Sequence, residues 1–364
     1  MQEPRTLSLR LHIDVPLLFG LVLLCAVGLI VLYSAGGEST DLIRRQAVRM
    51  MLAFAVMFTL AQIAPSHLLY WTPWLYVLGL ALLICVPLFG DAAQGAQRWL
   101  QIGPVKFQPS ELAKLSVPMM LAFFLVERSL PPRLAHIAVG FVLVALPTFL
   151  IARQPDLGTS VLIASSGVFV LFLAGISWRL ITMAGVVAAA CLPALWYVMR
   201  DYQRQRVLTF LDPEQDPLGA GYHIIQSKIA IGSGGIYGKG WLNGTQSQLE
   251  FLPERTTDFV FAVFSEEFGL LGVVTLLIMY LFVVLRGMYI AINAQDAYGR
   301  LVAGSLILTF FVYVFVNIGM VSGLLPVVGV PLPLVSYGGT SIVTLMAGFG
   351  LVMSIHTHRR LLSD

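Results

Sequence analysis

Several charged side chains lie in parts of the sequence that are otherwise almost entirely apolar. Asp258 follows the charged and aromatic string from Leu249 to Thr257 and directly precedes a long apolar run. A carboxylate placed there can take a proton from a hydroxyl group as a general base. Ionisable groups at membrane depth are costly, so each is a candidate for function. The alternative for Asp258 is a helix N-cap, although Thr256 and Thr257 would serve that purpose equally well.

Two further charged pairs are candidates. Glu111 and Lys114 are spaced i,i+3, which places both side chains on one face of a predicted helix. They either neutralise each other, or they present a carboxylate and a cation to a substrate. Arg153 and Asp156 flank a proline in a tight turn between two apolar runs. There they form either an interfacial ion pair or part of a site at a helix end.

A glycine cluster in residues 232–240 contains Lys239 and invites comparison with a phosphate-binding loop. A Walker loop needs Gly six positions before its Lys and Ser or Thr after it, whereas this chain has Ser233 and Gly240 at those positions. We therefore do not expect ATP binding. Glycines also let backbone N–H groups approach an anion, so an anion site that includes Lys239 stays open beside the alternative of a flexible turn.

Glu266 and Glu267 lie two turns beyond Asp258 in the same predicted helix. At about 1.5 Å per residue, Glu266 would lie on the order of 12 Å deeper than Asp258. We expect these acidic residues to line a water-filled cavity open to the outer face. Arg98 and Trp99 occupy a short connection between two predicted helices, where Trp99 belongs either to an interfacial aromatic belt or to a binding site.

Membrane-spanning helices must position all of these residues. The chain has 364 residues, of which 58% are hydrophobic and 11% charged, against roughly 25% charged residues in an average soluble protein. A spanning helix needs about 20 apolar residues. The sequence therefore predicts an all-α, polytopic membrane protein that forms one transmembrane domain over residues 1–364. The expected spans are 14–34, 46–64, 72–89, 110–127, 134–151, 157–174, 178–198, 258–285, 301–322 and 339–357.

Ten spans place both termini on the same side, and a modest excess of basic residues in the loops of that side predicts that the termini are cytoplasmic. The long connection of about 199–257 is then extracytoplasmic. We expect it to be partly ordered, with a short helix near residues 224–231. The net charge of +3 is small and the basic residues are dispersed, which excludes a nucleic-acid-binding surface.

Three strings together resemble the SEDS family of bacterial shape, elongation, division and sporulation proteins. The strings cover residues 95–114, 222–261 and 317–341, and the likeness extends over nearly the whole chain in order. Within the family, residues 240–248 and 251–255 are more similar to the elongation member than to the division member. One departure is Thr256, where family members commonly carry His, so a histidine at that place is not required for chemistry here.

The resemblance implies a multi-pass protein of the bacterial plasma (inner) membrane with a peptidoglycan glycosyltransferase activity that serves cell elongation and cell shape. Such an enzyme polymerises lipid II, which is both donor and acceptor, on the outer face of the membrane. The implied partner is a class B penicillin-binding protein, a transpeptidase. The family's catalytic aspartate matches Asp258, and its loop tryptophan matches Trp99.

The residues suit this chemistry. Asp258 would take the hydroxyl proton, and cations would stabilise the leaving undecaprenyl pyrophosphate. We find no separate nucleophile, so the transfer should invert the anomeric centre. A divalent cation, Mg or Mn, held by Asp258 or Glu254 would also neutralise pyrophosphate, although no metal-binding spacing is visible; no other cofactor is expected. The candidate substrate-binding residues are Trp99, Arg98, Glu111, Lys114, Arg153, Asp156, Lys239, Glu254 and Arg255.

Two alternatives use the same residues differently. In a lipid-linked saccharide flippase or transporter, Glu111, Lys114, Asp156 and Glu266 would form a transport path, but the chain shows no repeated halves with matching broken helices. A non-catalytic scaffold for cell-wall enzymes would give the polar helix ends no purpose. Incubation of the purified protein with lipid II distinguishes the enzyme from both alternatives.

Overall fold

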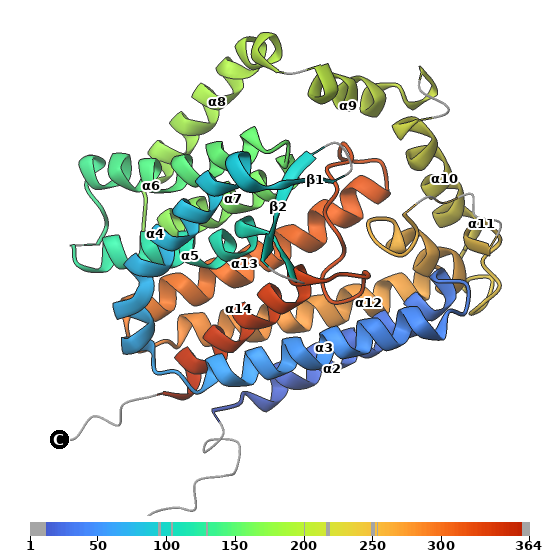
Figure 1. Ribbon diagram of the computed structural model, residues 1–364, viewed down its shortest axis with the longest axis horizontal. Coiled ribbons are helices and arrows are strands. Elements are labelled where there is room, and N and C mark those ends of the chain that lie inside the picture. The colour runs from blue at the N-terminus through green and yellow to red at the C-terminus, as the bar shows by residue number, and fades with distance from the viewer. Residues whose placement is uncertain are drawn as a thin grey trace, which may run out of the picture.

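The computed structural model describes residues 12–358 apart from 94–95, 103–104, 129, 200, 216–218, 249–251 and 253. Parts of the strings that carry the resemblance therefore lie outside the described residues. Helices make up nearly all of the described regular structure (Figure 1). The long helices are α2 (Val15–Ala35), α3 (Thr40–Ala61), α4 (Pro65–Phe89), α5 (Pro109–Val126), α6 (Leu134–Arg153), α7 (Leu157–Leu173), α8 (Trp178–Val198), α12 (Val260–Ile292), α13 (Ala297–Val321) and α14 (Thr340–Thr357).

These ten helices coincide with the ten predicted spans, and the predicted fold class is confirmed. Seven of them, among the described residues, are long and apolar enough to cross a membrane: α2, α4, α5, α6, α12, α13 and α14. The helix α7 and residues 178–191 of α8 are shorter apolar helices. The helix α3 starts six residues earlier than the predicted span, because Ser39 caps it and its charged first turns are helical too.

Local sequence signals explain where the helices begin. Asp14, Ser39, Asp156 and Asp296 are N-cap residues whose side-chain oxygens accept hydrogen bonds from backbone N–H groups of the first turn. The helices α4 and α5 have proline in the first turn, where the missing N–H has no intrahelical partner to lose.

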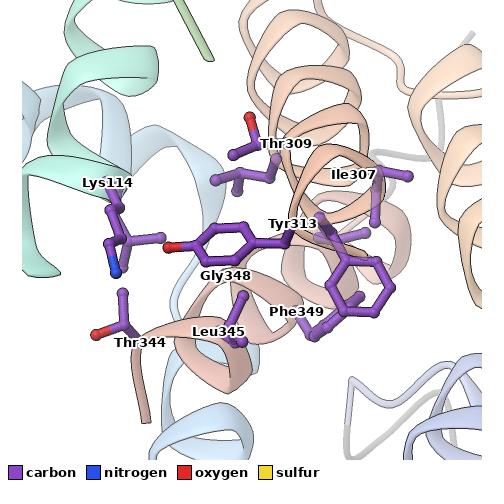
Figure 2. A pocket seen from close by; sticks show the side chains of 12 residues that line it. Lys114, Ile307, Thr309, Tyr313, Thr344, Leu345, Gly348 and Phe349 are labelled. Carbon is purple, nitrogen blue, oxygen red and sulfur yellow. The ribbon is translucent and has the colours of Figure 1, made fainter. Parts of the chain in front are cut away.

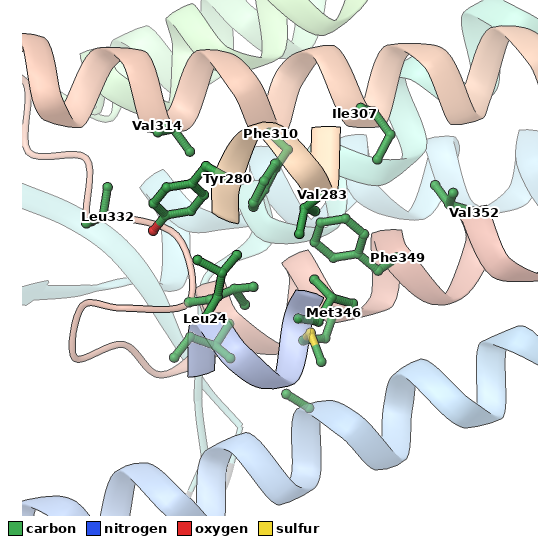
Figure 3. Packing of buried hydrophobic residues seen from close by; sticks show 14 of the residues in the cluster. Leu24, Tyr280, Val283, Ile307, Phe310, Val314, Leu332, Met346, Phe349 and Val352 are labelled. Atoms are coloured by element: carbon green, nitrogen blue, oxygen red, sulfur yellow. The ribbon is translucent and has the colours of Figure 1, made fainter. Parts of the chain in front are cut away.

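The core is centred on α13, which contacts α5, α7, α10, α12 and α14. Tyr280 and Val283 of α12, Phe310 of α13 and Phe349 of α14 interlock there (Figure 3). Small residues bring the helices close, as helix packing in membranes requires. A Cβ on Gly287 would lie 2.3 Å from Ile307 of α13, so α12 and α13 approach each other through this glycine.

The long connections, between α4 and α5, α8 and α12, and α13 and α14, lie at one end of the bundle. A three-stranded antiparallel sheet joins α4 to α5, with the order β1 (Asp91–Ala93), β2 (Ala96–Ile102) and β3 (Val105–Phe107). The sequence did not predict this sheet. At the opposite end Asp14 pairs with Arg286 at 2.6 Å and with His356 at 3.4 Å, which fastens α2 to α12 and α14.

The long connection after α8 is partly ordered, as predicted. It contains α9 (Asp201–Leu211), the short 3-10 helix η1 (Pro213–Gln215), α10 (Ala220–Ser233) and α11 (Thr245–Gln248). The helix predicted near residues 224–231 lies inside α10. Figure 1 shows α8, α9 and α10 as an arc that leaves the bundle and returns to it, where α10 contacts α12.

Candidate functional site

Asp258 lies in a series of turns that leads into α12. Within these turns, Thr257 donates hydrogen bonds to Glu254, from its backbone N–H to the carbonyl oxygen at 3.1 Å and from Oγ1 to Oε2 at 2.7 Å. The segment between α13 and α14 holds the turns from the other side. Ser336 Oγ donates to the Thr257 carbonyl at 2.6 Å, and the Tyr337 N–H donates to the Thr256 carbonyl at 2.8 Å.

The Asp258 carboxylate is available for chemistry. It is partly exposed, and it makes no hydrogen bond or ion pair with the part of the chain that the structure describes. Burial and the neighbouring Glu254 carboxylate raise the pKa of Asp258 to about 6, against the opposing effect of the Arg206 charge on α9. Gly329 lies beside this carboxylate, because a Cβ on Gly329 would be 3.5 Å from Oδ2.

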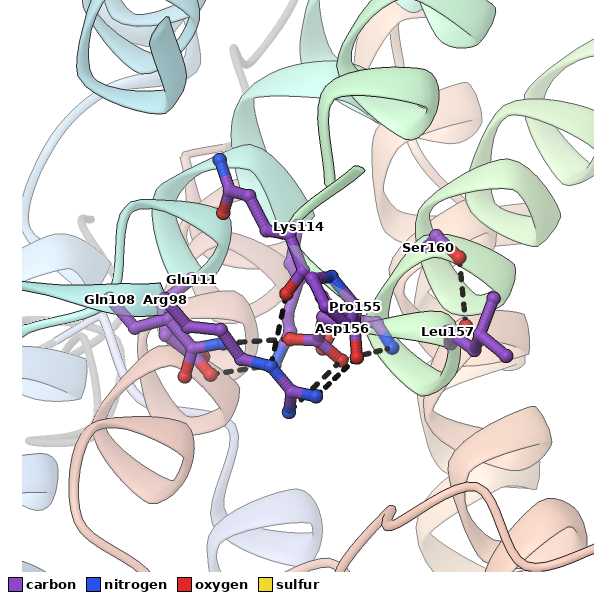
Figure 4. A network of polar contacts seen from close by, with 10 residues as sticks. Arg98, Gln108, Glu111, Lys114, Pro155, Asp156, Leu157 and Ser160 are labelled. Carbon is purple, nitrogen blue, oxygen red and sulfur yellow. Dashed lines mark hydrogen bonds and ion pairs between the residues drawn. The ribbon is translucent and has the colours of Figure 1, made fainter. Parts of the chain in front are cut away.

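A second polar cluster gathers around Asp156 (Figure 4). Gln108 donates from Nε2 to Asp156 Oδ2 at 2.8 Å, and Arg98 lies 4.0 Å from Oδ1. Arg98 Nε also donates to the Gln154 carbonyl oxygen at 3.2 Å, and Arg98 Nη2 donates to the Pro155 carbonyl oxygen. The sheet, the N-terminus of α5 and the α6–α7 turn are therefore joined by charged and amide groups.

Glu111 and Lys114 form a buried ion pair on α5. Lys114 Nζ lies 2.7 Å from Glu111 Oε1, and the two side chains are only 10% and 6% exposed. The ring of Tyr313 lies beside Lys114, with Nζ 5.4 Å from the ring centroid, and Figure 2 shows the Tyr313 hydroxyl directed toward Lys114. Lys114, Tyr313 and Thr309 border a small cavity of about 40 Å³. Among the residues that the structure describes, Glu111 Oε2 and Thr309 Oγ1 are buried without a hydrogen-bond partner.

The helix α13 connects this pair to Asp258. Tyr313 and Asn317 are four residues apart, so they share a helix face and are separated by about 6 Å along the axis. Asn317 Nδ2 donates to the Asp258 carbonyl at 2.9 Å. The segment 328–330 also packs against the first turn of α7, because a Cβ on Gly158 would lie 2.9 Å from the Val328 carbonyl oxygen. The three polar groups therefore meet at one end of the bundle.

Lys239 belongs to a different polar cluster, around Glu266 of α12. Its Nζ lies 2.7 Å from Glu266 Oε1, and Thr245 and the Gln246 N–H also donate to the Glu266 carboxylate. Glu266 and Glu267 are 0% and 1% exposed. The expectation that they line a water-filled cavity is therefore wrong. Residues 233–246 supply the hydrogen bonds of the Glu266 side chain, and Ser34 of α2 donates to Glu267 Oε1.

The glycine cluster bridges a break in α12. At Gly269 the backbone leaves the helical conformation (φ 63°, ψ −163°). The carbonyls of Glu266 and Glu267 accept instead from the N–H groups of Lys239 and Gly240, both at 3.0 Å. Leu270 N–H in turn donates to the Gly235 carbonyl at 2.9 Å. Residues 234–240 therefore replace helical hydrogen bonds at the break, which is a structural role for the cluster.

The remaining candidates lie in different surroundings. Arg153 is exposed and its guanidinium lies over the ring of Phe149, 4.9 Å from the centroid, so Arg98 rather than Arg153 is the arginine near Asp156. Arg255 lies in the Asp258 turns, with its guanidinium close to Gly37 in the α2–α3 connection. Trp99 is partly buried in β2, and its side chain points to the opposite face of the strand from Arg98.

The model of the FtsW, RodA and SpoVE family of cell-cycle proteins matches residues 8–361. This chain belongs to that family. It is 57% identical over 355 residues to the peptidoglycan glycosyltransferase MrdB of Escherichia coli, with 97% of this chain and 96% of MrdB covered. It is 35% identical to a probable peptidoglycan glycosyltransferase FtsW of Geobacter metallireducens, with 95% of each chain covered.

Solved structures of the family share the fold. A chain of a peptidoglycan synthase complex that coordinates polymerization and crosslinking superposes with a TM-score of 0.83 at 37% identity, with 96% of this chain and 98% of that chain covered. The rod shape determining protein RodA of Thermus thermophilus superposes with a TM-score of 0.74 at 30% identity, with 99% and 100% covered. The resemblance to the SEDS family that the motifs indicate is therefore confirmed.

Sequence reasoning missed three residues of the site: Gln108, Tyr313 and Asn317. Each is polar but uncharged at neutral pH, and the cost of burial is most evident in a sequence for charged groups. Asn317 carried the clearest signal, because an amide inside an apolar span of 25 residues needs hydrogen-bond partners.

Proposed function

We propose that this chain is a peptidoglycan glycosyltransferase that polymerises lipid II, with Asp258 as the general base. One observation carries the assignment of the base. Asp258 is a partly exposed carboxylate whose side chain is unpartnered among the described residues, and it is connected through α13 to the buried cation Lys114. The 57% identity to a peptidoglycan glycosyltransferase supports the class of reaction.

In the proposed reaction a sugar hydroxyl of one lipid II molecule attacks the anomeric carbon of the other sugar chain. The new C–O bond forms while the bond from the anomeric carbon to the phosphate oxygen breaks. The undecaprenyl pyrophosphate leaves with the electron pair, and the hydroxyl proton passes to Asp258. Because the pKa of Asp258 is about 6, the carboxylate is mostly ionised at neutral pH and still basic enough to assist. The displacement inverts the anomeric centre.

Cations near the leaving pyrophosphate stabilise its developing charge. Lys114 and Arg98 are the best placed, because each belongs to a cluster that adjoins the Asp258 turns, and Arg255 lies within those turns. Glu111, Asp156 and Gln108 hold the first two cations in place. Lys239 is engaged by Glu266 and Arg153 is directed away, so we assign neither to the pyrophosphate.

A divalent cation such as Mg²⁺ or Mn²⁺ fits the Asp258 turns only in part. Glu254 and Asp258 offer two carboxylates, and the described residues contain no group of three or more His, Cys, Asp or Glu that would hold a metal ion. Mg²⁺ commonly binds through one or two carboxylates together with water and substrate phosphates. Asp258 and Glu254 would hold such an ion, whose charge would neutralise pyrophosphate.

The same proposal places the protein in the plasma (inner) membrane. Both described chain ends, His12 and His358, lie at the end of the bundle opposite Asp258, and we assign this end to the cytoplasm. The site then faces outward, and a class B penicillin-binding protein is its partner. The related chain found in a synthase complex that coordinates polymerization and crosslinking supports this partner.

The test compares the wild type with Asp258→Asn. Both proteins are purified, shown to be monodisperse, and incubated with lipid II, with and without the transpeptidase. We expect the wild type to form glycan polymer and Asp258→Asn to form none, because the amide keeps the shape but cannot accept the proton. Near wild-type polymerisation by Asp258→Asn would refute the base assignment. Transfer of lipid II from one leaflet of a vesicle membrane to the other, without formation of polymer, would favour the flippase.

A further inference from the structure

Asn317 is completely buried near the end of α13, and its side chain joins two segments that flank Asp258. Its Nδ2 donates one hydrogen bond to the backbone oxygen of Asp258 at 2.9 Å and another to the backbone oxygen of Val330 at 2.7 Å. An amide nitrogen carries two hydrogens, and both are used here. One side chain therefore ties the Asp258 turn directly to the segment between α13 and α14.

This segment forms the wall beside the Asp258 carboxylate. Gly329, next to Val330, has a φ of +73°, and a Cβ on it would lie 3.5 Å from Asp258 Oδ2. The backbone therefore approaches the carboxylate at a residue without a side chain. The Asn317 amide holds Asp258 and this wall at a fixed separation, and it does so without contacting the carboxylate.

We propose that Asn317 is a positioning residue, which fixes the Asp258 carboxylate against the 328–330 segment so that it meets the acceptor hydroxyl of the substrate. This inference rests on the proposed function, because the group that is positioned is the proposed base. Asn317 does not contact the substrate, so its removal should slow the chemical step and leave substrate binding intact.

Other hydrogen bonds still hold the Asp258 turn when the Asn317 amide is removed. Ser336 Oγ still donates to the Thr257 carbonyl, and the Tyr337 N–H still donates to the Thr256 carbonyl. Loss of Asn317 therefore shifts Asp258 without unfolding the turn. A misplacement of about 1 Å in a reacting group can lower the rate by about 100-fold. We expect a loss of that size in kcat.

The experiment uses the full-length protein, lipid II as the probe, and the variant Asn317→Ala. Its matched control is Ser305→Ala. Ser305 is also buried on α13, and its hydroxyl donates to the Ser166 carbonyl at 2.8 Å, which ties α13 to α7 far from Asp258. Each variant loses one buried side chain that joins α13 to another segment. We measure kcat, KM for lipid II and the midpoint of thermal unfolding for both.

We expect Asn317→Ala to lower kcat by about 100-fold with KM nearly unchanged, while Ser305→Ala keeps kcat near that of the wild type. Asn317→Ser retains one hydroxyl donor and should recover part of kcat. If Asn317→Ala does not fold, the kcat of Asn317→Ser tests the positioning role in its place. Wild-type kcat in Asn317→Ala would overturn the proposal. An equal loss of kcat in Ser305→Ala, or a loss confined to KM, would overturn it too. Absence of polymer from the wild type would instead refute the proposed function.

Discussion

At the scale of single residues, the protonation state of Asp258 should set the pH dependence of the reaction. A general base must be deprotonated, so kcat/KM should rise with pH through about 6 and level off above it. Two neighbours have opposite effects on this pKa. Glu254→Gln removes a negative charge, so the pKa of Asp258 falls and the acidic limb moves to lower pH.

Arg206→Gln removes a positive charge, so the pKa rises and the limb moves to higher pH. The measurement is the pH profile of lipid II polymerisation for the wild type and both variants. If the acidic limbs of the pH profiles coincide in all three proteins, a group other than Asp258 controls the pH dependence.

The residues of the site could be predicted only in part. Asp258, Glu111 and Asp156 stood out because a charge in an apolar run is costly, and each lies at the candidate end of the bundle. The role of Lys239 could not be predicted, because its partner Glu266 is 27 residues away in the sequence. Glycine next to lysine suits an anion site and a close backbone contact equally well, and only the path of the chain distinguishes them.

At the scale of helices, α5 carries a pair whose order of charges can be reversed. If Glu111 and Lys114 served only to neutralise each other, the double variant Glu111→Lys with Lys114→Glu would lose only about 0.3–1 kcal/mol of stability to the helix dipole. We expect polymerisation to be nearly eliminated instead. In the proposed mechanism, the swap places a carboxylate where Lys114 would stabilise the pyrophosphate, in surroundings that are largely closed to water.

The control is the swap of Asp41 and Arg44, an exposed i,i+3 pair on α3 with a contact of 2.9 Å. Asp41 also pairs with Arg45 at 2.7 Å, so this swap removes one further exposed ion pair. That swap should leave polymerisation unchanged. Normal turnover by the α5 double variant, at normal expression, would remove Lys114 from the site.

The break in α12 gives a prediction about stability. Gly238 has a φ of +78°, and a Cβ on it would lie 2.1 Å from the Glu267 carbonyl oxygen. Gly238→Ala should therefore destabilise the protein by about 1–3 kcal/mol or more. Gly232→Ala is the control, because no atom lies within 4 Å of its Cβ position and its helical backbone suits alanine, which should add up to about 1 kcal/mol. Thermal unfolding in detergent measures both, and equal midpoints would contradict the bridging role of residues 234–240.

At the scale of the whole molecule, the number and order of the helices followed from the lengths of the apolar runs. Boundaries were displaced where charged residues continue a helix beyond the apolar part, as at Thr40 of α3. The small sheet could not be predicted, because its strands are three to seven residues long and depend on pairing with each other. The path of the long loop back to α12 depends on contacts between segments far apart in the sequence.

The two described chain ends meet at one point: the ring centroids of His12 and His358 are 3.8 Å apart. Complementary halves of a split fluorescent protein, joined to one chain next to His12 and next to His358, should therefore assemble with each other. Their fluorescence in living cells would show that the chain is folded, and halves that mature only in the cytoplasm would also report its orientation. In the proposed orientation, the same fusions would leave the opposite end of the bundle, which carries Asp258, free for lipid II and for the proposed partner enzyme.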